Sequence, residues 1–288
     1  MISTLFPKTH KKNQSFQSNM TLYLIGLGLC GAKDISVRAL EIVKSCDKIY
    51  FEAYTSLLSS TIEELSEFYG KEIILADRNQ SEQGMDDFIQ SAKDKDIAFL
   101  VIGDPVSATT HMGIYRTAKE QNIKIQVIHN ASIFSAVGIT GLQPYKFGKT
   151  TSIPFLDRVP NLETPYHVIK ANQSIGAHTL CLLDIMVDNV AQETGNKDQT
   201  ESNTRFMTIL QALEVLEDIE SRLKEKIITD ETLVVGCARL GHDDFIVKSG
   251  PLKEIKEFDF GAPLHSLVIP GKLHFSEEEM LDLWNEKK

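Results

Sequence analysis

An aspartate that directly follows an apolar segment is the sharpest chemical signal in this sequence. Residues 97–102 are apolar and are followed by Gly103-Asp104-Pro105. Proline ends the hydrogen-bonding ladder of a strand, and ligands of open α/β sheets bind beyond the carboxyl ends of the strands. Asp104 is therefore a candidate ligand-binding acid, although aspartate is also common in plain turns. The small and hydroxyl-bearing residues 106–110 suit hydrogen bonds to a carboxylate or a ribose, and they equally suit a helix start.

A glycine pattern near the start of the chain is the second candidate for a binding loop. Gly26-Leu-Gly-Leu-Cys-Gly31 fits the pattern of dinucleotide-binding proteins, in which the third glycine lies inside a helix and an acid about 20 residues later binds a ribose. Here Asp34 and Ser36 place the helix start several residues later, and neither Asp47 nor Glu52 ends the strand that we predict at residues 48–54. A nicotinamide enzyme is disfavoured on these grounds. The glycines either form only a tight turn or, as we prefer, let the backbone approach another nucleoside ligand.

The elements that must position these residues alternate between strands and helices in the first half of the chain. Apolar segments predict strands at residues 22–28, 48–54, 72–76, 97–102 and 123–128. Amphipathic segments predict helices at residues 36–46, 61–69, 81–95, 110–121 and 133–141. Thr61 and Glu64 form a capping box, and Gly70 is the expected stop of that helix. Such alternation predicts a mostly parallel sheet with helices on both faces.

The second half of the chain reads as a further α/β unit, connected through residues 143–152. We expect strands at residues 178–184, 233–239 and 264–269, and helices at 165–172 and 208–226. A last helix is predicted to be capped by Ser276-Glu-Glu-Glu279, and the polar residues 188–204 are predicted to form a surface loop. The sequence therefore predicts an α/β protein with an N-terminal domain at residues 20–150 and a C-terminal domain at residues 151–288.

Composition limits the classes of function that this chain can have. A net charge of −10 argues against a nucleic-acid partner, because such a surface needs a basic field. No apolar run approaches the ~20 residues that a membrane helix requires, so we expect no membrane partner. The four cysteines, Cys30, Cys46, Cys181 and Cys237, are far apart in the sequence. We therefore expect reduced thiols in a cytoplasmic protein and no metal site.

The first residues of the sequence differ from the rest in composition. Residues 1–19 contain Lys8, Lys11 and Lys12 but no acid, and they lack the continuous apolar segment of a secretory signal. We expect either a disordered extension or a true start at Met20, and we leave this stretch out of the predicted fold.

Six motifs, each weak alone, occur together in the order and spacing of one known family. They lie at residues 22–29, 103–111, 128–133, 178–184, 236–239 and 263–267. Together they resemble the diphthine synthases, a branch of the tetrapyrrole-methylase superfamily. The resemblance runs from about Met20 to the last helix and leaves out residues 1–19 and 188–204.

This resemblance implies two α/β domains with S-adenosylmethionine in the cleft between them, and a homodimer. It also implies a substrate, a histidine of translation elongation factor 2 that carries a 3-amino-3-carboxypropyl group. The amine of that group is methylated on the way to diphthamide. The implied cofactor contacts are Leu29, Asp104, Ser107, Ser132, Ile133, Leu183, Leu240 and His265. Without the resemblance, the apolar contacts would be read as core residues and His265 as a hydrogen-bonded core histidine.

The same resemblance separates branches of the superfamily. Porphyrinoid methylases bind many carboxylates and would profit from clustered arginine, whereas the first arginine after Asp104 is Arg116. A porphyrinoid methyltransferase and an NAD(P)-dependent oxidoreductase are the alternative functions. Residues 51–56 and 145–148 look closer to eukaryotic members, which implies four methyl transfers ending in a methyl ester. The sequence identifies no catalytic base.

Overall fold

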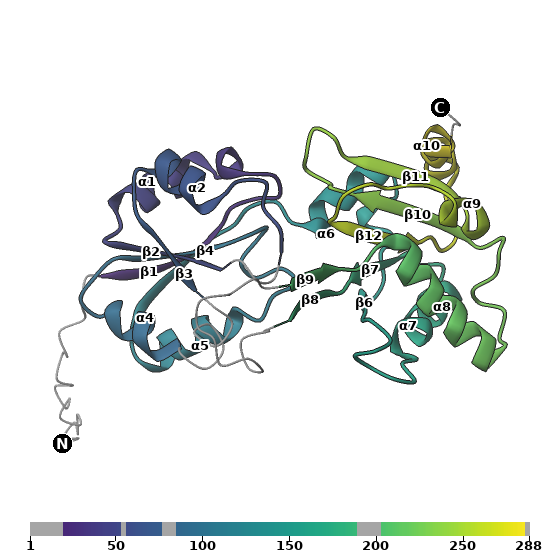
Figure 1. Cartoon of the computed structure of the whole chain (residues 1–288), viewed down its shortest axis with the longest axis horizontal. Helices are drawn as coiled ribbons and strands as arrows, with labels where there is room; N and C mark the ends of the chain where they lie inside the picture. The colour runs from purple at the N-terminus through teal and green to yellow at the C-terminus, as the bar shows by residue number, and fades with distance from the viewer. Residues whose placement is uncertain (1–19, 53–55, 77–84, 189–202, 286–288) are drawn as a thin grey trace, which may run out of the picture.

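The computed structural model of this chain describes residues 20–52, 56–76, 85–188 and 203–285. It shows two lobes side by side along the long axis of the molecule (Figure 1). The predicted extension at residues 1–19 lies outside the described residues. No helix in the described ranges is both long and apolar enough to cross a membrane.

The first lobe contains a parallel sheet of five strands in the order β3-β2-β4-β1-β5. Every pairing between neighbouring strands is parallel, which confirms the predicted parallel sheet. The strands are β1 (Thr21–Gly26), β2 (Lys48–Glu52), β3 (Ile73–Ala76), β4 (Ile97–Val101) and β5 (Lys124–Ile128). All of β4 is buried, because a central parallel strand is covered on both faces. The carboxyl ends of β4, β1 and β5 therefore lie next to one another.

Helices cover both faces of this sheet, as predicted. Helices α1 (Val37–Ser45) and α2 (Ile62–Tyr69) lie on one face, and α4 (Met85–Ser91) and α5 (Met112–Glu120) on the other (Figure 1). The predicted capping box of Thr61 and Glu64 is present, and Gly70 ends α2 with φ 68°. Ser36 accepts from Ala39 N–H at 3.2 Å and begins α1. The glycine pattern thus precedes the helix, as expected, with a short 3-10 turn η1 (Ala32–Asp34) between them.

The second lobe contains a mixed sheet in the order β11-β10-β12-β7-β6. Its strands are β6 (Thr151–Ile153), β7 (Thr179–Leu183), β10 (Leu233–Ala238), β11 (Ile246–Pro251) and β12 (His265–Ile269). Strand β10 runs antiparallel to β11 and β12, β12 runs antiparallel to β7, and only the β6–β7 pair is parallel. The sequence prediction contained no strand at β11, because polar residues interrupt its apolar ones.

Two clusters of apolar residues fill the faces of this second sheet. Helices α7 (Thr164–Ser174), α8 (Ile209–Leu223) and α9 (Leu252–Lys256) pack on one face. The other face is covered by α6 (Ile133–Ala136), the 3-10 turn η2 (Val137–Thr140) and α10 (Phe275–Asn285). The buried thiols of Cys181 and Cys237 lie in this lobe, where burial raises the pKa of each to about 12. All four cysteines are free, as expected.

Two details of the second lobe differ from the sequence prediction. Strands β8 (Ile185–Asp188) and β9 (Asn203–Phe206) form a hairpin, so the ends of the predicted loop at residues 188–204 are strand. The middle of that loop, residues 189–202, lies outside the described residues. The prediction that Ser276 caps the last helix is wrong, because α10 begins at Phe275 and the Glu277 carboxylate accepts from His274 N–H at 2.8 Å.

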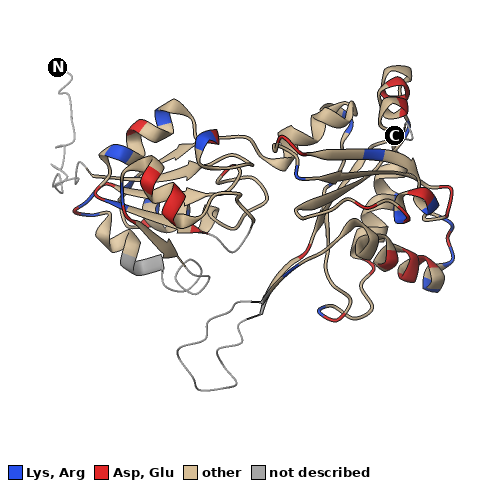
Figure 2. Ribbon diagram, turned by 45° about the horizontal axis from the view of Figure 1, so that its top comes forward, with Lys and Arg blue, Asp and Glu red and all other residues tan. Residues whose placement is uncertain are grey.

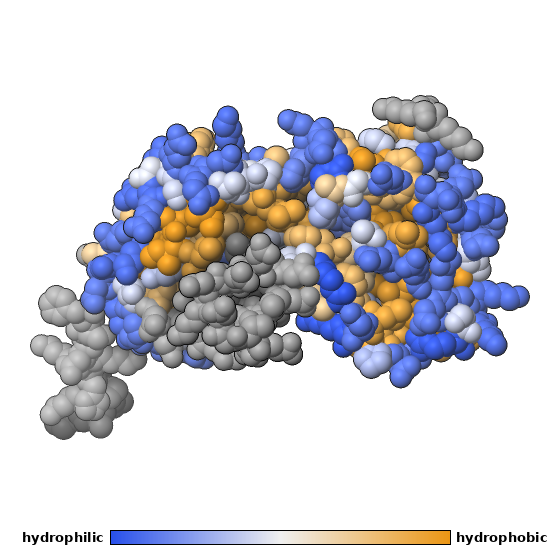
Figure 3. All heavy atoms as spheres, in the orientation of Figure 1, coloured by the Kyte–Doolittle hydropathy of each residue, from blue (hydrophilic) through white to orange (hydrophobic). Residues whose placement is uncertain are grey.

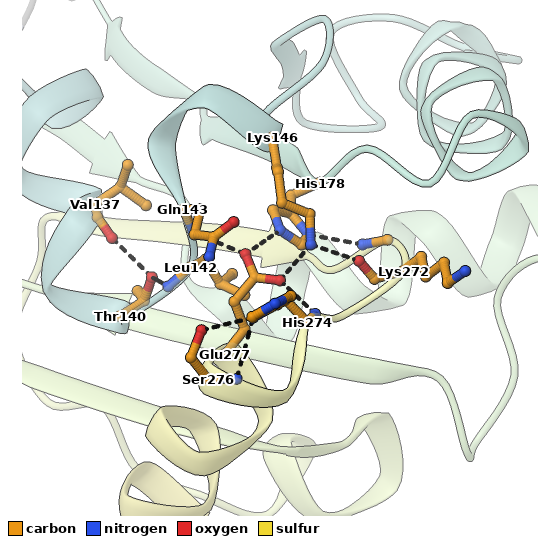
Figure 4. A network of polar contacts seen from close by, with 11 residues as sticks. Val137, Thr140, Leu142, Gln143, Lys146, His178, Lys272, His274, Ser276 and Glu277 are labelled. Atoms are coloured by element: carbon orange, nitrogen blue, oxygen red, sulfur yellow. Dashed lines mark hydrogen bonds and ion pairs between the residues drawn. The ribbon is translucent and has the colours of Figure 1, made fainter.

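The segment that joins the lobes packs against the second one. Val137 and Leu142 belong to the same apolar cluster as Leu180 and Val268 of the second sheet. A buried polar network fixes the end of this segment, since Gln143 N–H donates to Glu277 at 2.9 Å and Lys146 pairs with the same carboxylate (Figure 4). The chain thus contacts the second sheet well before residue 150, and the domain boundary at that residue stays a prediction.

Candidate functional site

Two loops meet at the carboxyl edge of the first sheet. Gly28 N–H donates to Gly103 O at 3.2 Å, and Gly103 N–H donates to Gly28 O at 2.7 Å. This isolated antiparallel bridge lies just beyond the last residues of the parallel strands β1 and β4. The glycine loop and the Gly103-Asp104-Pro105 turn, predicted separately from sequence, therefore form one structure.

A third loop, which follows β5, ties these two together through Asn130. The Asn130 amide Nδ2 donates to Gly26 O and to Asp34 O, each at 3.0 Å. Asn130 N–H donates to the Asp104 carboxylate at 3.2 Å. Asn130 thus donates hydrogen bonds to acceptors on both of the other loops, through its side chain and its backbone N–H. These bonds fix the relative position of the loops.

The Asp104 carboxylate is the centre of this arrangement. It is 5% exposed, and its Oδ1 accepts from Val106 N–H at 3.0 Å and from Ser107 Oγ at 3.1 Å. Its Oδ2 accepts from Asn130 N–H and is 2.8 Å from His129 Nδ1. Burial alone raises the pKa of Asp104, but these hydrogen bonds outweigh burial and hold the pKa below its ordinary value. Asp104 is therefore a carboxylate that organises the loops around it.

The glycines of the first loop are required by protein packing. A Cβ on Gly26 would lie 2.5 Å from Gly103 O, and a Cβ on Gly28 would lie 2.7 Å from Asp34 Cβ. These contacts account for Gly26 and Gly28 without a ligand, and the preferred interpretation, that glycine lets the backbone approach a nucleoside, stays a prediction. Gly103 is different, since its φ is +77° and a Cβ there would meet, among the described residues, only Ala131 O at 3.8 Å. Gly103 is itself buried, so its positive φ, and not crowding of a Cβ, favours glycine at this position.

The second lobe contacts the first loop directly. His242 Nε2 lies 3.1 Å from Leu29 O, and the space beside Gly241 is filled by the Leu29 side chain. Leu240 packs in one apolar cluster with Ile133, the residue that opens α6. Leu29, Ile133 and Leu240, named separately from the resemblance, thus lie where the two lobes meet.

Leu183 and His265 lie at the matching end of the second sheet. Ser266 pairs with Leu182 across β12 and β7, and Ala238 pairs with His265 across β10 and β12. The antiparallel register therefore places Leu183, His265 and the loop after Ala238 at one edge of this sheet. Because that loop includes Leu240 and Gly241, this is the edge that approaches the first lobe.

The ring of His265 is engaged on both nitrogens. Nδ1 accepts from Ile209 N–H at 3.3 Å, so the proton lies on Nε2, which donates to Ala262 O at 3.1 Å. Burial lowers the pKa of His265. Arg239 donates to Ala262 O and to Phe260 O and so holds the loop on which the ring rests. His265 is a neutral, fixed side chain and is not available for proton transfer.

Of the implied contacts, the structure brings most into one connected set. Asp104 and Ser107 bond to each other, Ser132 and Ile133 follow the Asn130 loop, and Leu29 touches the loop of Leu240. Leu183 and His265 stand at the facing edge. Sequence reasoning did not single out His129, Asn130, Arg239 or His242. His129 and Asn130 fall inside the motif at residues 128–133, and Arg239 ends the motif at residues 236–239, but neither motif indicates what these residues bind.

At the junction itself, the loop after β10 carries Arg239, which pairs with Asp244. Acidic residues are spread over outer helices such as α2, α8 and α10, and the segment joining the lobes carries few charges (Figure 2). Apolar surface is visible on both lobes beside their junction (Figure 3). A separate hollow of about 600 Å³ lies beside the first loop and is lined by residues 30–34, Ser59, Ser60 and the α2 residues Glu64, Glu67 and Phe68. None of the implied contacts lines it.

Comparison with known proteins places this architecture among methylases. Residues 21–256 match the family of tetrapyrrole (corrin/porphyrin) methylases. The diphthine methyl ester synthase of Homo sapiens is 46% identical over 92% of this chain and 95% of its own length. The diphthine synthase of Methanocaldococcus jannaschii is 46% identical over 90% of this chain and 97% of its own. A crystal structure of a diphthine synthase superposes with a TM-score of 0.79 at 40% identity, covering 92% of this chain and 96% of that one.

Proposed function

Because this chain belongs to the tetrapyrrole methylase family, and within it to the diphthine synthases, we propose the following function. It is an S-adenosylmethionine-dependent methyltransferase of diphthamide biosynthesis. Its substrate is the 3-amino-3-carboxypropyl group on a histidine of translation elongation factor 2. The observation that carries the proposal is the identity of 46% to relatives that align with 92% and 90% of this chain. A homodimer in the cytoplasm is part of the same proposal.

The residues at the junction of the lobes fit a nucleoside that also carries an amino-acid group. The hydroxyl of Ser107 keeps its lone pairs for a ligand while its proton is donated to Asp104. Apolar side chains of Leu29, Ile133 and Leu240 lie at the same junction of the lobes. We propose that these residues hold the cofactor together with Ser132 and, from the facing edge, Leu183 and His265.

Asp104 acts in this proposal mainly through the loops that it organises. A carboxylate offers about four acceptor sites, and protein donors already reach both of its oxygens. Loss of Asp104 would therefore move Ser107 and the third loop together. A lone turn aspartate would not have this effect.

The chemistry of methyl transfer requires little beyond positioning. S-adenosylmethionine supplies a methyl group on a positively charged sulfur, which leaves as a neutral thioether. The protein must hold the amine nitrogen ~3–3.5 Å from the methyl carbon and in line with the carbon–sulfur bond. Alignment of this kind lowers the activation barrier by several kcal/mol. The attacking amine must be unprotonated, so its proton needs an acceptor.

We further propose four transfers, ending in a methyl ester. Residues 145–148 and 51–56 are the motifs that favour the eukaryotic type of product, although residues 53–55 lie outside the described part of the chain. Three transfers convert the amine to a trimethylammonium group. In the fourth, the substrate carboxylate attacks the methyl carbon, and no proton has to be removed.

Two measurements test this function. S-adenosylhomocysteine at ~100 times its dissociation constant should stabilise the folded protein by about 2.7 kcal/mol, and a nicotinamide cofactor should not. The intact mass of elongation factor 2 after exhaustive reaction should rise by four methyl groups, one of which mild base removes. A product that stops at three, with nothing base-labile, would rule out the ester while keeping the trimethylation.

A further inference from the structure

An exposed histidine is paired with the buried carboxylate at the centre of the candidate site. His129 follows β5 directly, and its Nδ1 lies 2.8 Å from Asp104 Oδ2. The His129 side chain is 68% exposed, whereas that of Asp104 is 6% exposed. This pair joins a fixed acid to an imidazole that solvent or a substrate can reach.

The protonation of this histidine follows from its partner. The Asp104 carboxylate accepts three other hydrogen bonds, from Val106, Ser107 and Asn130, and is ionised. An ionised carboxylate can only accept, so His129 Nδ1 must carry a proton and donate it. In the neutral ring, Nε2 then has no proton and presents a lone pair.

The orientation of the ring is fixed, and its second nitrogen is available. The neighbouring Asn130 N–H donates to the same Asp104 Oδ2, so backbone and ring are held by one atom. Among the residues that the structure describes, no partner contacts His129 Nε2, and Asp104 is the only titratable group in contact with the ring. Asp34 reaches the same loop only through its backbone carbonyl, which accepts from Asn130.

We propose that His129 is the general base of the methyl transfer, an inference that rests on the proposed function. His129 Nε2 removes a proton from the substrate ammonium and becomes an imidazolium, which Asp104 stabilises. The freed amine lone pair then forms the nitrogen–carbon bond. The carbon–sulfur bond breaks, and its electron pair stays on the neutral thioether. The imidazolium returns its proton to water before the next transfer.

This assignment distinguishes the transfers to nitrogen from the transfer to oxygen. Each of the three transfers to nitrogen releases one proton and requires the base. The transfer to the carboxylate releases none and does not. A residue that only shapes the binding loops would affect all four transfers alike.

The first experiment compares two substitutions at His129 in the full-length protein. In His129→Asn the side-chain amide can still donate to Asp104, but no basic nitrogen remains, whereas His129→Ala removes both. If His129 is the base, both variants should lose about 10²–10⁴-fold in the rate of the first transfer and keep S-adenosylhomocysteine affinity within about threefold. Their rates should partly recover as pH rises, because solvent then deprotonates the amine.

A matched control for this experiment is His167→Ala on α7. The His167 side chain is 53% exposed, and its Nε2 lies 3.5 Å from Glu163 Oε2. It lies outside the candidate site. The methylation rate of His167→Ala should equal that of the wild-type protein. If His129→Asn methylates at the unchanged rate while His129→Ala does not, the histidine only holds Asp104 in place and the proposal is overturned.

The second experiment isolates the transfer to oxygen. Elongation factor 2 is methylated fully with the unchanged enzyme, its ester is removed with mild base, and the trimethylated product is given to His129→Asn. The ester should re-form at a rate within about threefold of the unchanged enzyme. A loss as large as that in the first transfer would overturn the assignment. Failure of the unchanged enzyme to methylate the factor at all would instead refute the proposed function.

Discussion

Two buried carboxylates, one at the junction of the lobes and one inside the second lobe, have similar hydrogen-bond partners. Asp104 and Glu277 are 5% and 0% exposed, and each pairs with a histidine. Glu277 accepts from Gln143 N–H, His274 N–H, His178 Nε2 and Lys146 (Figure 4). Burial alone raises the pKa of each carboxyl, but the lowering effect of the hydrogen bonds is larger. The pKa of Asp104 is therefore lowered, and that of Glu277 falls to about 2.

The two sites differ in what the histidine can still do. His178 is fully buried, and its Nδ1 accepts from Gly271 N–H at 2.9 Å. Its proton therefore lies on Nε2, which donates to Glu277 at 3.0 Å. Both nitrogens of His178 are engaged by protein, whereas His129 keeps one exposed. A carboxylate–histidine pair serves stability when both ring nitrogens are bound, and it can serve proton transfer when one is left for a substrate.

The largest expected effect is the loss of stability on removing Glu277. In Glu277→Ala the buried donors of Gln143, His274 and His178 lose their acceptor and Lys146 loses its counter-charge. Breaking a buried charged pair of this kind costs about 3–5 kcal/mol. Unfolding in urea should show this loss, and Glu278→Ala, an exposed neighbour on the same helix, should change stability by less than about 0.5 kcal/mol. Equal effects of the two substitutions would contradict a structural role for the Glu277 network.

The dependence of stability on pH sharpens the same contrast. The folded-state pKa of Glu277 is depressed from 4.5 to about 2, so its contribution is complete above pH 4.5 and is lost as pH falls toward 2. The shift corresponds to roughly 3 kcal/mol. The difference in unfolding free energy between the unchanged protein and Glu277→Gln should therefore shrink across this window. A difference that stays constant from pH 6 to pH 3 would show that the charge of Glu277 is not what matters.

Removal of Asp104 should mainly affect binding and leave the fold in place. Asp104→Ala leaves Val106 N–H, Asn130 N–H and the Ser107 hydroxyl without their acceptor, at a cost of about 1–3 kcal/mol. We expect most of this to appear as affinity for S-adenosylhomocysteine weakened by about 10–100-fold in calorimetry, because these donors lie on loops that are only partly buried and can rearrange. Unaltered affinity would refute the role of Asp104 in organising the cofactor site.

The sequence predicted local structure well and long-range polar partners poorly. The strands of the first lobe were predicted because buried parallel strands are continuously apolar, and α2 because its capping box and Gly70 lie within ten positions of each other. The buried role of Glu277 could not be predicted, because Lys146 and His178 are 131 and 99 positions away. His129 reaches Asp104 only because the strand order β4-β1-β5 brings the end of β5 close. The amino-acid sequences around Asp104 and His129 do not predict that strand order.

The smallest expected effect separates holding Asp104 from touching the cofactor. Ser107 Oγ donates its one proton to Asp104 at 3.1 Å, so toward a ligand it can only accept. Ser107→Ala removes one of the hydrogen bonds of Asp104 and this acceptor, which together are worth about 1 kcal/mol. We expect affinity for S-adenosylhomocysteine to fall about three- to tenfold, with a melting temperature within ~1 °C of the unchanged protein. Ser174→Ala on α7, whose hydroxyl donates to Ala171 O at 2.7 Å in an exposed position, is the matched control and should leave affinity unaltered. If Ser107→Ala lowers the melting temperature but not the affinity, Ser107 acts as a structural support like the partners of Glu277, and the contrast between the two carboxylates would then rest on His129 alone.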